Sequence, residues 1–282
     1  MSVLEYIIDS KKYEVEVGEN QIFECGEDVV YSNRDNDICF DQSWYHKGYD
    51  IVGLQNKKSF NHLKAGLTGC VKEIVNKELG LNATDFDLEK YHDYIRSDED
   101  HYRVVSRTRD LYSKDFNFPI FEVTKKFEKT LGFKLTDVNP RNNKKLHVII
   151  RINRPGSSDY NPPHKDIYEG VDEVSSYIPQ FVNFWIPICG VDENSSLPIA
   201  VSSHRISESK IFRTRVGSIV GNNRYRVRMV KEWNRDNSLV RAQVAEGQAL
   251  VFTSHLVHGL ATNDNENKTR ISLEFRLFKS SD

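Results

Sequence analysis

Two histidines and an aspartate in this chain have the residue types and the spacing of ligands for a metal ion. His164 and Asp166 are two residues apart and follow a Pro-Pro pair that stiffens the approach. In extended backbone, residues i and i+2 point to the same face, so an imidazole nitrogen and a carboxylate oxygen would aim at one point. The segment ALVFTSHLVHG offers His255 and His258 as a remote third ligand. Two histidines and one carboxylate leave three positions of an octahedron open, which is the ligand set of non-haem Fe(II) oxygenases.

An arginine and a serine after the second histidine predict what would fill the open positions. 2-Oxoglutarate takes two of them through its keto-acid end, and its other carboxylate then needs a buried partner. Arg270 comes twelve residues after His258, and a guanidinium holds a carboxylate by two parallel hydrogen bonds. Ser272 follows on the same face and would add a hydroxyl donor. Each feature is common by itself, but together they predict an iron site with 2-oxoglutarate as co-substrate.

Seven segments in the second half of the chain predict the strands that would position these side chains. They alternate or are rich in β-branched residues, and no long helix separates them. Strands at such short spacing favour an antiparallel sandwich or jelly roll. The segments are 146–152, 177–188, 196–201, 225–230, 239–245, 249–259 and 270–278.

The first half of the chain predicts supporting elements. Short strands are expected within residues 1–40. Apolar residues at three- and four-residue steps predict a helix over 59–79, ended by Gly80, and a second over 120–131. These helices would cover one outer sheet. We therefore expect one domain over 1–282, with N-terminal strands and supporting helices in 1–140 and the β core in 141–282.

Composition excludes several classes of protein. The 282 residues carry 39 Lys+Arg against 41 Asp+Glu, and a net charge of -2 gives no argument for a nucleic-acid partner. No apolar run approaches the roughly 18 residues of a spanning helix, so we expect no membrane insertion. The four cysteines are far apart and the N-terminus has no basic signal region, which favours a cytoplasmic protein. A chain this long needs no metal merely to fold, so a metal here would serve chemistry.

Three longer segments surround the candidate ligands: KGYDIVGL, FWIPICGVDENSSLPIAVSSH and GQALVFTSHLVHGLATNDNENKTRISLEF. They are similar to the N-terminal, central and last segments of the phytanoyl-CoA dioxygenase-like family of Fe(II)/2-oxoglutarate oxygenases. The resemblance covers 47–278 and implies a mainly β fold, with a double-stranded β-helix (jelly roll, cupin-like) core buttressed by N-terminal helices. It places the metal histidine on His258, and strand parity with Phe252 favours His258 over His255. Two departures, VSSH for the usual PGSH and Gln248 for an aspartate, concern subfamily and substrate.

The resemblance also implies an activity. The chain would be an Fe(II)- and 2-oxoglutarate-dependent dioxygenase that uses dioxygen to hydroxylate an unactivated C–H bond of a small-molecule metabolite, releasing succinate and CO₂. Related halogenases have a small residue where Asp166 stands, so hydroxylation is favoured over halogenation. Two alternatives are a non-catalytic jelly-roll binding protein and a cupin-like metalloenzyme that does not use 2-oxoglutarate. The full ligand set speaks against the first, and Arg270 with Ser272 speaks against the second.

Five further residues are expected near the pocket. Asn183 and Trp185 alternate on one strand and either face the interior, where one would contact 2-oxoglutarate, or pack in the core. Arg151 precedes the H-x-D pair and is expected to contact substrate or co-substrate. The turn-rich segment NRPGSSDYNPP suits a mobile lid. Tyr160 or Lys165 would then contact the substrate.

A basic stretch has two interpretations. It is either a solvated strand pair or an anion-accepting rim for an anionic or carrier-linked substrate. Only Glu232 interrupts it, Asp236 follows it directly, and it lacks the series of aromatics that single-stranded nucleic acid would stack on. Its members are Arg213, Arg215, Arg224, Arg226, Arg228, Lys231 and Arg235.

Overall fold

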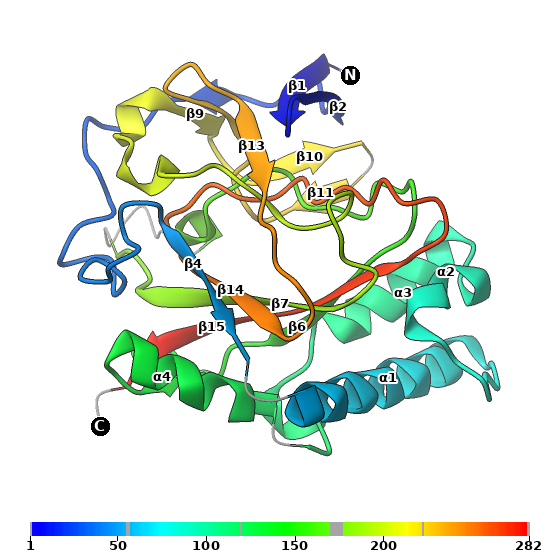
Figure 1. Ribbon diagram of the computed structural model, residues 1–282. Helices are drawn as coiled ribbons and strands as arrows, with labels where there is room; N and C mark the ends of the chain where they lie inside the picture. Colours follow the sequence, from blue (N-terminus) through cyan, green and yellow to red (C-terminus); the bar gives the residue numbers. More distant parts are fainter. Residues whose placement is uncertain (1, 55–56, 119, 170–176, 222, 281–282) are drawn as a thin grey trace.

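Strands dominate the fold, and in Figure 1 they form two layers with helices outside one of them. The computed structural model describes residues 2–54, 57–118, 120–169, 177–221 and 223–280. Its strands are β1 (Ser2–Ile8), β2 (Lys11–Val17), β3 (Phe23–Glu24), β4 (Tyr49–Gly53), β5 (Leu135–Thr136), β6 (Val148–Asn153), β7 (Phe181–Cys189), β8 (Pro198–Ile199), β9 (Ile211–Thr214), β10 (Ser218–Val220), β11 (Asn223–Tyr225), β12 (Val230–Trp233), β13 (Ser238–Arg241), β14 (Gln248–Thr253) and β15 (Arg270–Lys279). Its α-helices are α1 (Lys57–Leu79), α2 (Tyr91–Tyr94), α3 (Asp98–Thr108) and α4 (Lys125–Leu131).

The strands form a mainly antiparallel jelly-roll core. The main sheet has the order β4-β14-β7-β15-β5, and β6 pairs with β15 on the same edge as β5. The second sheet has the order β11-β10-β2-β1-β13-β8, in which only β1 and β13 run parallel. A small third sheet joins β12, β9 and β3. The mainly β, cupin-like architecture expected from the sequence is confirmed.

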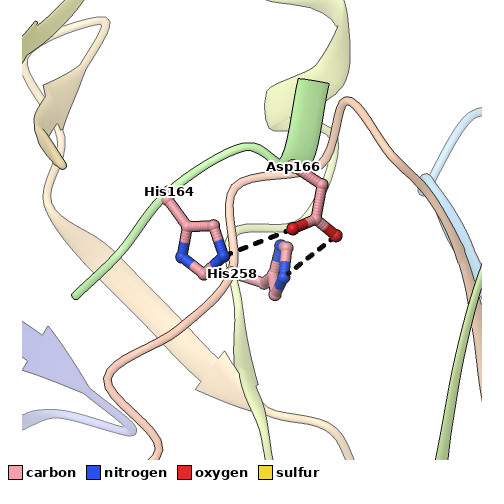
Figure 2. Close-up of side chains that lie close together, drawn as sticks. All are labelled: His164, Asp166 and His258. Atoms are coloured by element: carbon pink, nitrogen blue, oxygen red, sulfur yellow. Dashed lines mark ion pairs between the residues drawn. The ribbon is translucent and has the colours of Figure 1, made fainter. Parts of the chain in front are cut away.

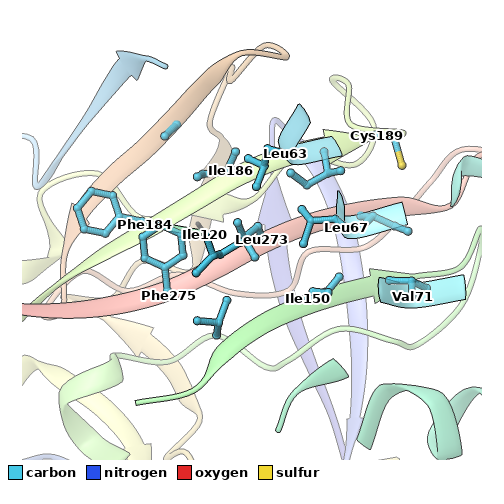
Figure 3. Close-up of a cluster of buried hydrophobic side chains, with 14 of the residues drawn as sticks. Leu63, Leu67, Val71, Ile120, Ile150, Phe184, Ile186, Cys189, Leu273 and Phe275 are labelled. Atoms are coloured by element: carbon cyan, nitrogen blue, oxygen red, sulfur yellow. The ribbon is translucent and has the colours of Figure 1, made fainter. Parts of the chain in front are cut away.

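Helix α1 covers the outer face of the main sheet. Its apolar residues recur every three or four positions and are buried, so the helix expected over 59–79 is confirmed. Gly80 follows with φ +67, a left-handed conformation that glycine adopts without strain. In Figure 3 the helix and the sheet share one apolar cluster, which includes Leu63, Leu67, Val71, Ile150, Ile186 and Leu273.

Two expectations about local structure were wrong in part. The segment 225–230 is not one strand, because β11 ends at Tyr225 and β12 begins at Val230. The helix expected over 120–131 divides into a 3₁₀ turn, Ile120–Thr124, and α4. Helix α3, which Ser97 caps, has no counterpart in the sequence prediction. Two of its four buried residues are polar, so its apolar stripe is narrow.

Strand β15 presents different chemistry on its two faces. Ile271, Leu273 and Phe275 face the helices and belong to the apolar cluster. Arg270, Glu274 and Arg276 alternate with them and line a cavity between the layers. The main sheet therefore carries a row of polar side chains into the interior. No helix in the described ranges has the length and apolar character needed to cross a membrane.

Candidate active site

His164, Asp166 and His258 converge on one point in the wall of the cavity. One ligand atom of each residue lies within 4.8 Å of those of the other two, and all three residues are buried. His164 Nε2 is 3.4 Å from Asp166 Oδ1, and His258 Nε2 is 3.7 Å from Asp166 Oδ2. Figure 2 shows the carboxylate facing both rings. Two imidazoles and one carboxylate in this arrangement could hold a divalent transition metal and leave room for further ligands.

Backbone contacts orient both histidine rings. The two residues form an antiparallel bridge, in which each backbone N–H donates to the other's carbonyl at 2.9 and 3.0 Å. His164 Nδ1 lies 2.7 Å from the Pro162 carbonyl oxygen, and His258 Nδ1 lies 3.0 Å from that of Leu256. A carbonyl oxygen only accepts, so each Nδ1 carries the proton and each Nε2 keeps its lone pair for a metal.

The chain path to these ligands differs from the one that the sequence analysis used. Strand β14 ends at Thr253, so a turn precedes His258 and strand parity does not reach it. Asp166 begins a 3₁₀ turn, Asp166–Glu169, instead of continuing an extended strand. The three expected ligands do meet. What brings them together is the backbone contact between the segments around His164 and His258, and not strand alternation.

Gly259 allows that contact. It has φ +132, and a Cβ at this position would lie 2.5 Å from the Pro162 carbonyl oxygen. Backbone would have to move to make room for any side chain, and the bridge beside His258 would move with it.

Gly259→Ala should therefore destabilise the fold by about 1–3 kcal/mol and weaken metal binding, since it combines backbone strain with a steric clash. Chemical unfolding and metal titration would measure the two effects. Gly80→Ala is the matched control, because Gly80 also has positive φ but nothing within 4 Å of its Cβ position. Equal losses in the two variants would contradict the argument from the clash.

Arg276 holds the aspartate of this cluster, a contact that is absent from the residues predicted for the site. Its Nη2 is 2.5 Å from Asp166 Oδ1. Burial raises the pKa of Asp166, but Arg276 and the two histidines together hold it well below its usual range. Arg276 shares the β15 face with Arg270, so the alternation in RISLEFR could have revealed it.

His255 lies outside the cluster. It is buried, and its Nε2 is 3.1 Å from the Asn36 carbonyl oxygen. Burial lowers the pKa of His255. It is a core histidine in a different environment from His258.

The cavity beside the cluster has a volume of about 660 Å³ and contains donors without acceptors. Arg270 is fully buried, and one of its nitrogens, Nη1, donates to Asn153 Oδ1 at 2.6 Å. Its Nε and Nη2 have no hydrogen-bond partner among the residues that the structure describes, and neither do Asn183 Nδ2 and Trp185 Nε1. Burial lowers the pKa of Arg270 to about 9, although Glu274 acts in the opposite direction. Such donors fit a buried carboxylate, which would accept from them.

Arg151 and Ser272 contact a carboxylate of the protein itself. Arg151 donates from Nε and Nη2 to Glu274 at 2.9–3.0 Å and from Nη1 to Asn161 Oδ1 at 3.1 Å. Ser272 Oγ donates to Glu274 Oε1 at 3.1 Å. Arg151 lines the cavity, but its guanidinium is engaged within the wall.

Tyr160 and Lys165 lie in different surroundings. Tyr160 lines the cavity, and its carbonyl oxygen accepts a hydrogen bond from the Tyr225 hydroxyl at 3.0 Å. Its segment is anchored to α3, because Arg154 Nη2 donates to Asp98 Oδ1 at 2.6 Å. Lys165 is buried away from the cavity lining, and its Nζ is 2.8 Å from Glu208 Oε1.

Glu208 is the centre of this second buried cluster. Besides Lys165, it accepts from the Tyr168 hydroxyl at 2.6 Å and pairs with Arg213 at 3.4 Å. Burial by itself raises the pKa of Glu208. The charges of Lys165 and Arg213 more than offset this rise, so the pKa lies below its usual value and the carboxyl group is charged. The cluster joins the segment after His164 to β9.

We expect Glu208→Gln to destabilise the protein by about 3–5 kcal/mol, because two buried cations would lose their counterion. The Glu24→Gln control removes an exposed pair with Arg215 and should change the free energy of unfolding by about 0–1 kcal/mol. Urea unfolding of both variants makes the comparison. A Glu208→Gln variant as stable as the control would show that the cluster does not support the fold.

A family model supports the assignment that this geometry suggests. The model described as phytanoyl-CoA dioxygenase (PhyH) matches residues 79–272. That range contains all three clustered ligands and Arg270. No curated protein matches the chain in a sequence search.

Several solved structures share the overall arrangement at low identity. AviO1 from Streptomyces viridochromogenes Tue57 has 11% identity and a TM-score of 0.43, with 91% of this chain and 97% of AviO1 covered. SnoK, a non-heme alpha ketoglutarate dependent carbocyclase from nogalamycin biosynthesis, has 12% identity and a TM-score of 0.44, with 91% and 88% covered. ThoJ, a non-heme monooxygenase, has 12% identity and a TM-score of 0.46, with 84% and 75% covered. Similarity at this level carries no argument about activity.

Proposed function

Because the chain belongs to the phytanoyl-CoA dioxygenase family, we propose that it hydroxylates an unactivated C–H bond of a small molecule. Fe(II) and 2-oxoglutarate are its cofactor and co-substrate, and the chemistry is that of a non-haem iron oxygenase. One observation carries the proposal: a two-histidine, one-carboxylate cluster shares a cavity with a buried arginine, two of whose nitrogens have no partner in the described ranges. The cavity volume lies within the roughly 300–1,000 Å³ of small-molecule sites.

Each residue of the site has a proposed role. His164, Asp166 and His258 would hold iron through two Nε2 atoms and a carboxylate oxygen. Arg270 would bind the distal carboxylate of 2-oxoglutarate through its free nitrogens. Asn183 and Trp185, whose N–H groups also lack partners among the described residues, are the candidates for further contacts with 2-oxoglutarate or substrate. Iron held by these residues would supply the activation of dioxygen, whose two oxygen atoms would go to succinate and to the product.

The remaining residues keep the site in position. Arg276 would fix the carboxylate of Asp166, and the Nδ1–H bonds would fix the histidine rings. Arg151, Glu274 and Ser272 form a closed set of contacts beside Arg270, so we assign them to the wall that orients its guanidinium. Residues from both 1–140 and 141–282 line one cavity, which favours a single catalytic domain over 1–282.

The presence of Asp166 favours hydroxylation over halogenation, since a carboxylate in this position occupies the place that a halide would need. A non-catalytic binding protein would have no use for a complete ligand set. A cupin-like metalloenzyme without 2-oxoglutarate would leave Nε and Nη2 of Arg270 buried without an acceptor, and an unsatisfied buried donor of a charged group is unfavourable.

Anaerobic addition of Fe(II) and then 2-oxoglutarate to the purified protein tests the proposal. We expect a weak visible charge-transfer band that needs both additions. On admission of dioxygen, succinate should form, and a screen of metabolites should find compounds that stimulate it. Iron binding without the band would favour the cupin-like alternative, and absence of iron binding would favour the non-catalytic one.

A further inference from the structure

The cavity wall carries more positive charge than the proposed chemistry uses. Two carboxylates line it, Asp166 and Glu274, against six arginines. Three of the arginines have partners or a proposed role: Arg151 pairs with Glu274, Arg276 pairs with Asp166, and Arg270 would bind 2-oxoglutarate. The other three are Arg109, Arg224 and Arg226.

The side chains of Arg109, Arg224 and Arg226 have no counterion among the residues that the structure describes. No side-chain hydrogen bond or ion pair joins any of them to the part of the chain that the structure describes, and Arg109 Nε is buried without a partner there. Burial, and then Arg151, lower the pKa of Arg109 to about 10. A partly buried guanidinium without an anion is unfavourable, so its retention in a cavity wall needs an explanation.

The three arginines come from two segments that line the same cavity. Arg109 caps α3, and Arg224 and Arg226 flank Tyr225 at the end of β11. Burial raises the pKa of Tyr225, whereas the charges of Arg109 and Arg151 lower it, and the Tyr225 hydroxyl donates to the Tyr160 carbonyl oxygen at 3.0 Å. Arg224 and Arg226 are exposed whereas Arg109 is half-buried, so the group extends from the rim of the cavity into its wall.

We propose that the substrate carries a phosphate or carboxylate group, and that Arg109, Arg224 and Arg226 form the subsite that binds it. This inference rests on the proposed function and specifies its substrate class. Guanidinium groups bind both anions through parallel N–H bonds, and a cluster of like charge at a cavity mouth attracts anions from solution. Of the basic stretch in the sequence, only Arg224 and Arg226 line the cavity, whereas Arg213 and Arg215 pair with Glu208 and Glu24.

The rest of the cavity suits the uncharged part of such a substrate. Phe181, Phe252 and Val227 are among the apolar side chains that line it, together with Trp185 and Leu197. A molecule with an apolar body and an anionic head would therefore match the lining. The head would be bound by the three arginines and the body would extend into the cavity.

Calorimetry with three compounds that share one apolar body tests the subsite. The protein is loaded with Ni²⁺, which is redox-inert, and with 2-oxoglutarate, so that the metal site and Arg270 are occupied. Benzyl phosphate, phenylacetate and benzyl alcohol are then titrated. We expect at least one of the two anions to bind about tenfold more tightly than the alcohol, because it gains charge-assisted hydrogen bonds. The preferred anion identifies the phosphorylated or the carboxylated class.

Variants locate the binding. Arg109→Gln, and the double variant Arg224→Gln with Arg226→Gln, should each lower the affinity for the preferred anion about tenfold. The affinity for benzyl alcohol should not change. Arg109→Lys keeps the charge and should retain part of the affinity. Arg215→Gln is the matched control, because Arg215 lies in the same basic stretch but pairs with Glu24.

Two outcomes would overturn the subsite. In one, both anions bind no better than benzyl alcohol. In the other, Arg215→Gln weakens them as much as the cavity variants do. Failure of the proposed function would give a different result from either outcome. In that case 2-oxoglutarate would not bind to the Ni²⁺-loaded protein in the loading step, before any of the three compounds is added.

Discussion

Replacing His258 with alanine should remove Fe(II) binding and, with it, turnover. His258 supplies one of only three protein ligand atoms in the cluster, and the bridge to His164 keeps its Nε2 directed at the site. We expect iron affinity to fall by more than the roughly 10–100-fold caused by losing a residue that only orients a ligand. His164→Ala and Asp166→Ala should behave alike. Anaerobic iron titration, followed by the charge-transfer band, measures the effect.

His255→Ala is the matched control for this prediction. His255 is three residues away and equally buried, but its Nε2 lies near the Asn36 carbonyl oxygen and it does not join the cluster. The control should therefore keep its iron. Metal-free His164→Ala and His258→Ala should remain folded, because a chain of this length does not need a metal to fold. Asp166→Ala should lose some stability in addition, because Arg276 would lose its partner. Iron loss in His255→Ala as severe as in His258→Ala would mean that the wrong histidine was chosen.

The fold was predictable where one face of an element is apolar over many residues. Helix α1 and strand β15 have long, regular patterns, and both lie where the sequence places them. Helix α3 escaped prediction because its buried face includes His101 and Thr108. The split of 225–230 escaped because apolar alternation continues through residues that are not paired in a sheet.

The residues of the candidate site were predictable from type and spacing, but the reasons for their positions were not. His258 shares no strand with Phe252, and the backbone bridge to His164 places it instead. That bridge joins segments 94 residues apart, and a single sequence shows no sign of such pairing. The glycine after His258 was visible, but the clash that it avoids was not.

For Lys165 and Arg151, the partners of the side chain could not be predicted from the sequence, because these partners lie far away along the chain. Lys165 follows His164 directly, and its partner Glu208 lies 43 residues away in a buried cluster. Arg151 lines the cavity as expected, but Glu274 and Asn161 occupy its donors. Charge alone cannot separate an arginine that binds a ligand from one that supports the wall. Among the arginines of the cavity, the buried donors left without acceptors make the distinction, and they identify Arg270 and Arg109.

Arg270→Ala should raise the apparent dissociation constant for 2-oxoglutarate by about 30-fold or more. Removing one partner of a buried, charge-assisted pair typically costs about 2–5 kcal/mol, and each 1.4 kcal/mol is a factor of ten. Arg270→Lys should be nearly as impaired, because an ammonium group cannot replace two nitrogens directed at one carboxylate. Titration of 2-oxoglutarate into the Ni²⁺-loaded protein measures both variants without turnover.

The control for Arg270 is Arg241, another buried arginine, whose Nη1 donates to the carbonyl oxygens of Ser196 and Thr262 at 2.9 and 3.1 Å. Arg241→Lys removes a guanidinium from the same core without touching the cavity, so it should leave 2-oxoglutarate affinity within about twofold even if stability falls. Iron affinity without co-substrate should barely change in any of these variants, because Arg270 is not a ligand. If Arg270→Ala lost iron but kept its dependence on 2-oxoglutarate, the carboxylate would have to bind elsewhere in the cavity, and Arg276 would be the next candidate, since it lines the same face of β15.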